Sequence, residues 1–160
     1  MNKIKRVLFI CLGNTARSPV AEYLARYYAQ GNNADLIFSS AGFINAFNYM
    51  QKESQEYLNS KNINHSDFQP QLITHALLES QDLILTMEKS LSIDIIRNYR
   101  TITNIEKKTY TLKEFNGETQ NLDINDPYYT STDTYRKVMK IIDNNVRMAI
   151  KKIQDYNNSM

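Results

Sequence analysis

Short apolar runs alternate along the chain with segments of helical periodicity. The runs are too short for helices and are typical of strands buried on both faces of a parallel sheet. They predict strands at residues 5–10, 36–40, 82–87 and 109–112. Between them, apolar residues recur at three- and four-residue steps, which predicts helices at residues 20–30, 51–61, 72–79 and 88–99.

Three details refine these boundaries. Gly31, Asn32 and Asn33 are expected to end the first helix, whose apolar face should include Tyr27. Ala41-Gly42 is expected to break the second strand. Residues 45–50 are expected to form a loop.

The clearest amphipathic pattern lies near the C-terminus, where apolar residues recur from Tyr135 to Ile153. The cluster Ser131-Thr132-Asp133 precedes it and supplies capping residues for a long helix. The alternation of strands and helices predicts one α/β domain over residues 1–160, in three α/β/α layers around a four-stranded parallel sheet. In such folds ligands bind beyond the carboxyl ends of the strands.

Composition narrows the function classes. The formal net charge of +2 and the scattered basic residues do not indicate a nucleic-acid binder. No apolar run is long enough to span a membrane, and no secretory signal is expected. The single cysteine excludes an internal disulfide and indicates a reducing compartment, so we expect a cytoplasmic protein. His65 and His75 are expected at the surface, and neither a metal nor a cofactor is expected.

That cysteine lies where the first predicted strand passes into the first predicted helix, in the sequence Cys11-Leu12-Gly13-Asn14-Thr15-Ala16-Arg17-Ser18-Pro19. Free N–H groups at a helix start bind anions, and an arginine can hold two phosphate oxygens at once. A cysteine in such a loop is favoured as the thiolate nucleophile. The segment resembles the phosphate-binding loop of the low-molecular-weight protein tyrosine phosphatases, in the form Cys-x5-Arg-Ser-Pro. The phosphate loop after the first strand therefore includes Leu12, Gly13, Asn14, Thr15, Ala16 and Ser18.

A second motif, Asp126-Pro127-Tyr128-Tyr129, lies in the loop before the last helix. It is similar to the general-acid loop of the same family. The resemblance extends over most of the chain, and includes Ser39-Ser40-Ala41-Gly42, residues 82–88 and residues 111–115.

The resemblance implies a role for each residue of these motifs. Cys11 is the nucleophile that forms a phosphocysteine, Arg17 holds the phosphoryl oxygens, and Asp126 is the general acid and then the base. Ser18 holds the thiolate, and Asn14, bonded to Ser40, keeps the loop in its conformation. The implied partners are a phosphorylated protein as substrate and inorganic phosphate as product, with the protein acting as a monomer.

The chain departs from the family at two positions. Ala16 stands where many members have a second cysteine, so an oxidised Cys11 has no thiol to form a disulfide with. Asp67 stands where a histidine is usual, so part of the family's hydrogen-bond network behind the loop is not expected to be conserved in this chain.

Two substrates remain open. Tyrosine phosphatases of this family commonly have Ile where this chain has Thr15, whereas bacterial protein arginine phosphatases have Thr there. The rings of Tyr128 and Tyr129, with Phe43, Phe47 and Tyr49 opposite, are expected to wall a slot for a flat aryl phosphate. We therefore favour phosphotyrosine, with phosphoarginine as the alternative. A phosphate-binding module without turnover is the non-enzymatic alternative, although such a module would have no use for Asp126.

Overall fold

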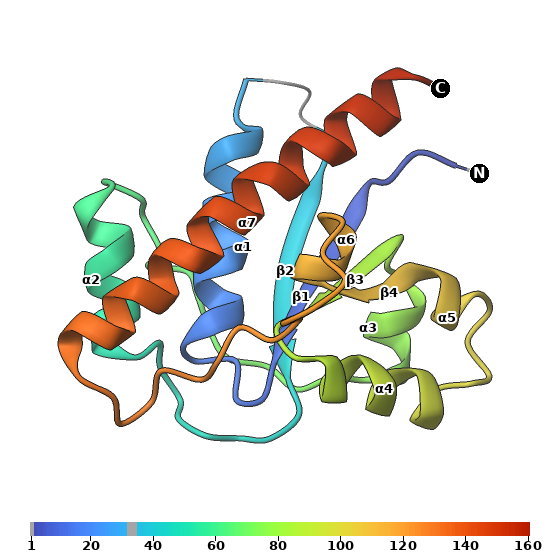
Figure 1. The fold of residues 1–160 in the computed structure, drawn as a ribbon. Helices are drawn as coiled ribbons and strands as arrows, with labels where there is room; N and C mark the ends of the chain where they lie inside the picture. The colour runs from blue at the N-terminus through green and yellow to red at the C-terminus, as the bar shows by residue number, and fades with distance from the viewer. Residues whose placement is uncertain (1, 32–34) are drawn as a thin grey trace.

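A four-stranded parallel sheet with the strand order β2-β1-β3-β4 forms the centre of the molecule (Figure 1). The structure is a computed structural model and describes residues 2–31 and 35–160. The elements run in the order β1 (Arg6–Cys11), α1 (Arg17–Ala29), β2 (Ile37–Gly42), α2 (Lys52–Ser60), α3 (His75–Glu79), β3 (Leu83–Thr86), α4 (Lys89–Asn98), α5 (Ile105–Lys108), β4 (Thr109–Thr111), α6 (Leu112–Phe115) and α7 (Thr132–Asn158).

Helices cover both faces of this sheet, as Figure 1 shows. Successive residues of a strand point to opposite faces. Val7 and Phe9 of β1 accordingly join a core with residues of α1 and α7, while Leu8 and Ile10 join a second core with residues of α3, α4 and α5. The predicted three-layer α/β/α architecture with a four-stranded parallel sheet is confirmed.

The parallel register brings the carboxyl ends of three strands to one edge. Cys11 is opposite Gly42 of β2, and Ile10 is opposite Thr86 of β3. The segments that follow β1 and β3 therefore leave the sheet side by side, and Asp126, from the segment before α7, reaches the same edge.

The predicted helix at residues 72–79 was too long at its start. Leu72 instead forms a parallel bridge with Gly42, and the Ile73 N–H donates to the Gly42 carbonyl at 2.9 Å. Helix α3 begins only after Thr74, whose side chain accepts from the Leu77 N–H. Pairing with the end of β2, which lies far away in sequence, holds the segment extended.

Two further boundaries and the exposure of one side chain differ from the prediction. Strand β2 does not break at Ala41 but continues through Gly42. Leu112 is the first residue of α6 and not the last of a strand, because Thr111 and Glu114 form a capping box there. Tyr27, expected on the inner face of α1, is 45% exposed.

Helix α1 has Gln30 as its C-cap, and Asn32 and Asn33, predicted to help end it, lie outside the described residues. Helix α7 has the predicted N-cap, since the Ser131 side chain accepts from the Thr134 N–H. Among the described residues, no helix combines the length and the apolar character that crossing a membrane requires.

Candidate active site

The Cys11 side chain lies at the carboxyl end of β1, almost fully buried. Its sulfur is 3.0 Å from Ser18 Oγ and accepts from the backbone N–H of Asn14 at 3.3 Å. A serine hydroxyl and a backbone N–H both donate hydrogen bonds, so both can stabilise a negative charge on sulfur.

Asn14 holds the loop in an unusual conformation. Its φ is 52°, in the left-handed region that asparagine tolerates better than most residues. Its amide donates to Ser18 Oγ and to Ser40 Oγ, both at 2.9 Å, and its Oδ1 accepts from the Gln71 N–H at 3.0 Å. The expected contact between Asn14 and Ser40 is therefore present, and these bonds offset the backbone strain.

Asp67 lies at the outer end of the network behind the loop. It is exposed, accepts from the Tyr23 hydroxyl at 2.8 Å and lies 3.6 Å from the Arg26 guanidinium. Gln71 contacts the loop directly, since its side chain also donates to the Ser40 carbonyl at 2.9 Å. Sequence analysis missed Gln71 because a glutamine in a loop carries no pattern of its own.

Behind Ser40 lies a buried carboxyl group that sequence analysis also missed. Ser40 Oγ donates to Glu22 at 2.6 Å, and Arg26 of the same helix pairs with Glu22. Burial raises the pKa of Glu22. The position of Glu22 within α1 predicts an exposed helical residue, so no sequence signal identifies it.

Arg17 is 1% exposed, which is unusual for a charged side chain. Its Nη1 donates to Glu88 at 2.6 Å and to the Ile124 carbonyl at 2.8 Å. Its Nε is buried and has no hydrogen-bond partner among the described residues. Two hydrogen bonds thus fix the Nη1 end of the guanidinium, while Nε remains a donor without a partner among the described residues.

Glu88 was not among the predicted site residues. It directly follows Thr86-Met87 at the carboxyl end of β3, which is the neighbour of β1. A carboxylate at this edge of a parallel sheet is the signal that would have identified it.

Asp126 lies beside the loop although it is distant in sequence. Its Oδ2 is 3.8 Å from Arg17 Nη2, and its Oδ1 accepts from the Tyr128 N–H at 3.0 Å. The side chain is 43% exposed, so water and a substrate can reach it. The structure therefore brings Cys11, Arg17 and Asp126 to one edge of the sheet.

The remaining loop residues differ in exposure. Leu12 is 40% exposed, and its carbonyl accepts from the N–H groups of Phe43 and Ile44. Thr15 and Ala16 are buried. Thr15 therefore offers little surface to the solvent side of the loop.

Part of the predicted aromatic slot is absent. Phe47 stacks on Tyr128 with ring centroids 5.6 Å apart and an interplanar angle of 6°, and Tyr49 lies 5.4 Å from Phe47. Tyr129, however, is 96% exposed, with φ of 65°, because the turn after Pro127 directs it into solvent. Phe43 packs against the core of Leu8 and Ile10 instead of lining the site.

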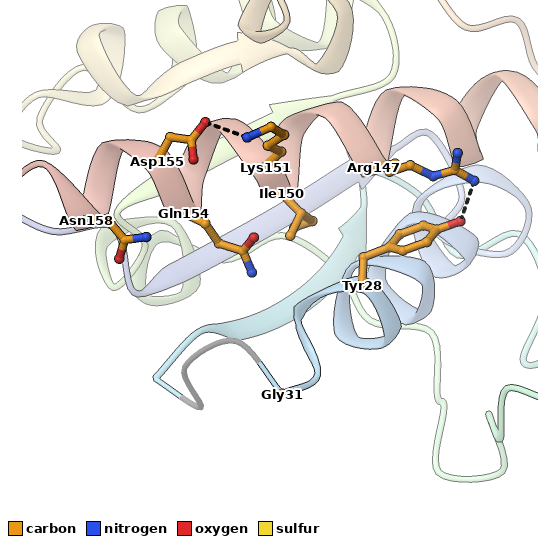
Figure 2. A pocket seen from close by; sticks show the side chains of 8 residues that line it. All are labelled: Tyr28, Gly31, Arg147, Ile150, Lys151, Gln154, Asp155 and Asn158. Atoms are coloured by element: carbon orange, nitrogen blue, oxygen red, sulfur yellow. Dashed lines mark hydrogen bonds and ion pairs between the residues drawn. The ribbon is translucent and has the colours of Figure 1, made fainter.

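A separate hollow lies between the end of α1 and the second half of α7 (Figure 2). The Arg147 guanidinium donates to the Tyr28 hydroxyl at 3.2 Å, and Lys151 pairs with Asp155 along α7. None of the predicted site residues lines this hollow. Within residues 2–31 and 35–160, no three histidine, cysteine, aspartate or glutamate side chains gather as metal ligands.

Solved structures share this fold. The YwlE arginine phosphatase, a mutant with a phosphorylated active site serine, superposes with a TM-score of 0.84 at 27% identity, over 97% of this chain and 99% of that one. A low molecular weight protein tyrosine phosphatase from T. tengcongensis superposes with a TM-score of 0.82 at 30% identity, over 92% and 98% of the two chains.

Sequence comparisons agree with this likeness. A protein-arginine-phosphatase of Bacillus subtilis (strain 168) is 30% identical over 154 residues, which are 92% of this chain and 96% of that protein. The low molecular weight protein-tyrosine-phosphatase PtpA of Staphylococcus haemolyticus (strain JCSC1435) is 30% identical over 150 residues, 91% of this chain and 94% of that protein. The family model described as low molecular weight phosphotyrosine protein phosphatase matches residues 6–158. The chain therefore belongs to this family of cysteine-dependent phosphatases.

Proposed function

We propose that this chain hydrolyses phosphotyrosine in proteins, with Cys11 as nucleophile, Arg17 as phosphate clamp and Asp126 as general acid. The observation that carries the proposal is the buried Arg17 guanidinium, whose Nε has no partner among the described residues. A buried donor without a partner is costly, and a phosphate oxygen would satisfy it. Because Glu88 holds the other side of the guanidinium, the free donor is presented in a fixed direction.

The chemistry follows in two steps. The Cys11 thiolate attacks phosphorus, and the bond from phosphorus to the tyrosine oxygen breaks with its electron pair on that oxygen. The Asp126 carboxyl group gives this oxygen a proton. The resulting Asp126 carboxylate then takes a proton from water, whose oxygen attacks phosphorus, the P–S bond breaks, and inorganic phosphate leaves.

The charge distribution supports these steps. Asn14 N–H and Ser18 can stabilise the sulfur when it is the attacking group and again when it is the leaving group. The Arg17 guanidinium lies where negative charge spreads over the phosphoryl oxygens in the transition state. The loop residues Leu12, Gly13, Thr15 and Ala16 supply backbone N–H groups around the same centre.

The aromatic rim favours an aryl substrate. The stacked pair of Phe47 and Tyr128, with Tyr49 beside it, presents flat apolar surface next to Asp126. A tyrosine ring packs favourably against such surfaces. Tyr129 is exposed, but its ring lies 4.6 Å from that of Tyr128, so it extends the same aromatic rim toward solvent.

Phosphoarginine is the second candidate. Thr15 occupies the position where arginine phosphatases of the family have Thr, and one of the similar proteins is a protein-arginine-phosphatase. The two candidates share Cys11, Arg17 and Asp126 and differ in the leaving group. We also propose a reducing compartment such as the cytoplasm and action as a monomer.

Turnover assays on a phosphotyrosine peptide and a phosphoarginine peptide, with a chelator present, test the proposal. We expect a clear preference for phosphotyrosine in the wild type, the same preference in Thr15→Ile, and no turnover by Cys11→Ser. A preference for phosphoarginine that is lost in Thr15→Ile would instead support the arginine phosphatase function. No turnover of either peptide, with phosphate still protecting Cys11 from alkylation, would indicate a binding module.

A further inference from the structure

The back of the phosphate loop is held by the start of α2. The backbone N–H of Gln51 donates to the Thr15 carbonyl at 2.8 Å. The Ser54 hydroxyl donates to the Ala16 carbonyl at 2.9 Å. Two consecutive peptide groups of the loop are therefore fixed from the same side.

Tyr135 of α7 holds both of these supporting residues. Its hydroxyl lies 2.7 Å from Ser54 Oγ and 2.9 Å from Gln51 Oε1. Each hydroxyl carries one hydrogen. With the Ser54 hydrogen on the Ala16 carbonyl, the Tyr135 hydrogen is shared between Ser54 Oγ and Gln51 Oε1.

Two of the three side chains in this cluster are shielded from water, while Gln51 is half-buried. Ser54 is fully buried and Tyr135 is 2% exposed. A buried hydrogen bond that is removed is not replaced by bulk water, so its loss is felt by the partner groups. Burial also raises the pKa of Tyr135, so its hydroxyl keeps its proton and remains a donor at physiological pH.

The Gln51 side chain bonds to the loop although the residue lies at the start of a helix. It is the N-cap residue of α2, but its side chain makes no capping bond to that helix. Its Nε2 donates instead to Thr15 Oγ1 at 3.2 Å. Ser, Thr, Asp or Asn at this position would satisfy the first N–H groups of α2, which is why they are preferred there. The side chain thus serves the loop and not its own helix.

The contacts to the Thr15 and Ala16 carbonyls also set the direction of the N–H groups that follow them. In a trans peptide the C=O and the following N–H point in opposite directions, and no cis bond is present in the described residues. With the Thr15 and Ala16 carbonyls directed toward α2, the N–H groups of Ala16 and Arg17 are directed away from it. Both N–H groups lie at the start of α1, where no intrahelical acceptor exists.

We propose that Gln51, Ser54 and Tyr135 are positioning residues that fix two loop peptides so that the N–H groups of Ala16 and Arg17 donate to the phosphate. This inference rests on the proposed function, and it assigns the orientation of the loop to residues outside the loop. None of the three is a catalytic residue, because they act through Thr15 and Ala16.

Tyr135→Phe and Ser54→Ala test the inference, because each removes one hydroxyl group. The N–H groups of Ala16 and Arg17 would contact the phosphate in the substrate and in the product as well as in the transition state, so a change in their direction should raise KM and weaken inhibition by phosphate. We expect KM for para-nitrophenyl phosphate and the inhibition constant of inorganic phosphate to rise about tenfold in each variant, in line with the loss of one charge-assisted hydrogen bond.

Tyr57→Phe is the matched control. Tyr57 is a tyrosine of α2 that also contacts α7, and its hydroxyl donates to Asp143 instead of the loop. We expect its Tm to fall while KM and phosphate inhibition stay at wild-type values. A purely structural role for Tyr135 and Ser54 would give the same result for all three variants, and that result would overturn the inference.

Amide NMR resolves the outcome residue by residue. Inorganic phosphate should shift the Ala16 and Arg17 amide signals in the wild type, and the Arg17 shift should shrink in Ser54→Ala. Unchanged shifts in Ser54→Ala would contradict the inference even if Tyr135→Phe did not fold. The titration measures phosphate binding and does not depend on turnover. If phosphate shifts the Ala16 and Arg17 amide signals but the protein hydrolyses neither peptide, the proposed function is refuted and the inference stands.

Discussion

At the scale of single residues, the site depends on how the Arg17 charge is compensated. Glu88 bonds Arg17 at 2.6 Å and its side chain is 28% exposed, while Asp126 lies 3.8 Å from Arg17 and is 43% exposed. A charge pair at the shorter distance and greater burial is the stronger one. Glu88 therefore orients Arg17, and Asp126 is left available for the proton transfer that we propose.

Substitution of Asp126 separates proton transfer from phosphate binding. We expect Asp126→Asn to lower kcat for phosphotyrosine about 100-fold, since general acids contribute roughly that much or more. The loss should be smaller for para-nitrophenyl phosphate, whose leaving group needs less protonation. Inhibition by inorganic phosphate should be as strong as in the wild type or stronger, because one negative charge near Arg17 is removed. An equal loss for both substrates would argue against the acid role.

At the scale of secondary-structure elements, the backbone at the end of β2 packs directly against the backbone of the loop after β1. A Cβ atom at Gly42 would lie 2.8 Å from the Asn14 nitrogen and 2.9 Å from the Leu12 oxygen. Both neighbours are backbone atoms of the loop, so only a displacement of the loop could make room. The glycine that was expected to end the strand thus allows the strand to pass directly beneath the loop.

Gly42→Ala should therefore damage the site and the fold together. We expect kcat/KM to fall at least about tenfold, and the free energy of unfolding to drop by about 1–3 kcal/mol, as in other overpacked cores. Steady-state kinetics and urea unfolding would measure the two effects. Wild-type kinetics in a variant of unchanged stability would show that the loop has more freedom than this contact indicates.

At the scale of the whole molecule, one buried carboxylate joins three helices. Asp143 of α7 is 3% exposed and accepts hydrogen bonds from Tyr28 of α1 and Tyr57 of α2. Lys61, just after α2, lies 3.1 Å from it. Burial acts to raise the pKa of Asp143, but these three partners outweigh it and hold the pKa below its ordinary value of 3.8.

The sign of this shift sets a pH dependence. A carboxyl group with a lowered pKa in the folded protein stabilises the fold above its unfolded pKa, and this contribution is lost as the pH falls through the folded value. We expect Asp143→Asn to lower the free energy of unfolding by about 2 kcal/mol at pH 7. The difference from the wild type should shrink below pH 3.8. Urea unfolding at several pH values checks this, and a difference that is constant down to low pH would refute it.

The sequence alone determined the features that depend on local patterns. The apolar runs placed the strands, the three- and four-residue periodicity placed the long helices, and Ser131 marked the start of α7. The position of the loop from Cys11 to Arg17 could also be predicted, since it lies between an apolar strand pattern and a helical pattern. These features require only the chemistry of neighbouring residues.

Tertiary structure decided what depends on residues distant in sequence. Leu72 is extended because it pairs with Gly42, and Tyr129 is exposed because its turn directs it outward. Glu88, Gln71 and the supporting residues of α2 and α7 reach the loop only after the sheet has formed. Local periodicity shows which face of an element is apolar, but the partner of a polar side chain depends on which segments the fold places beside it.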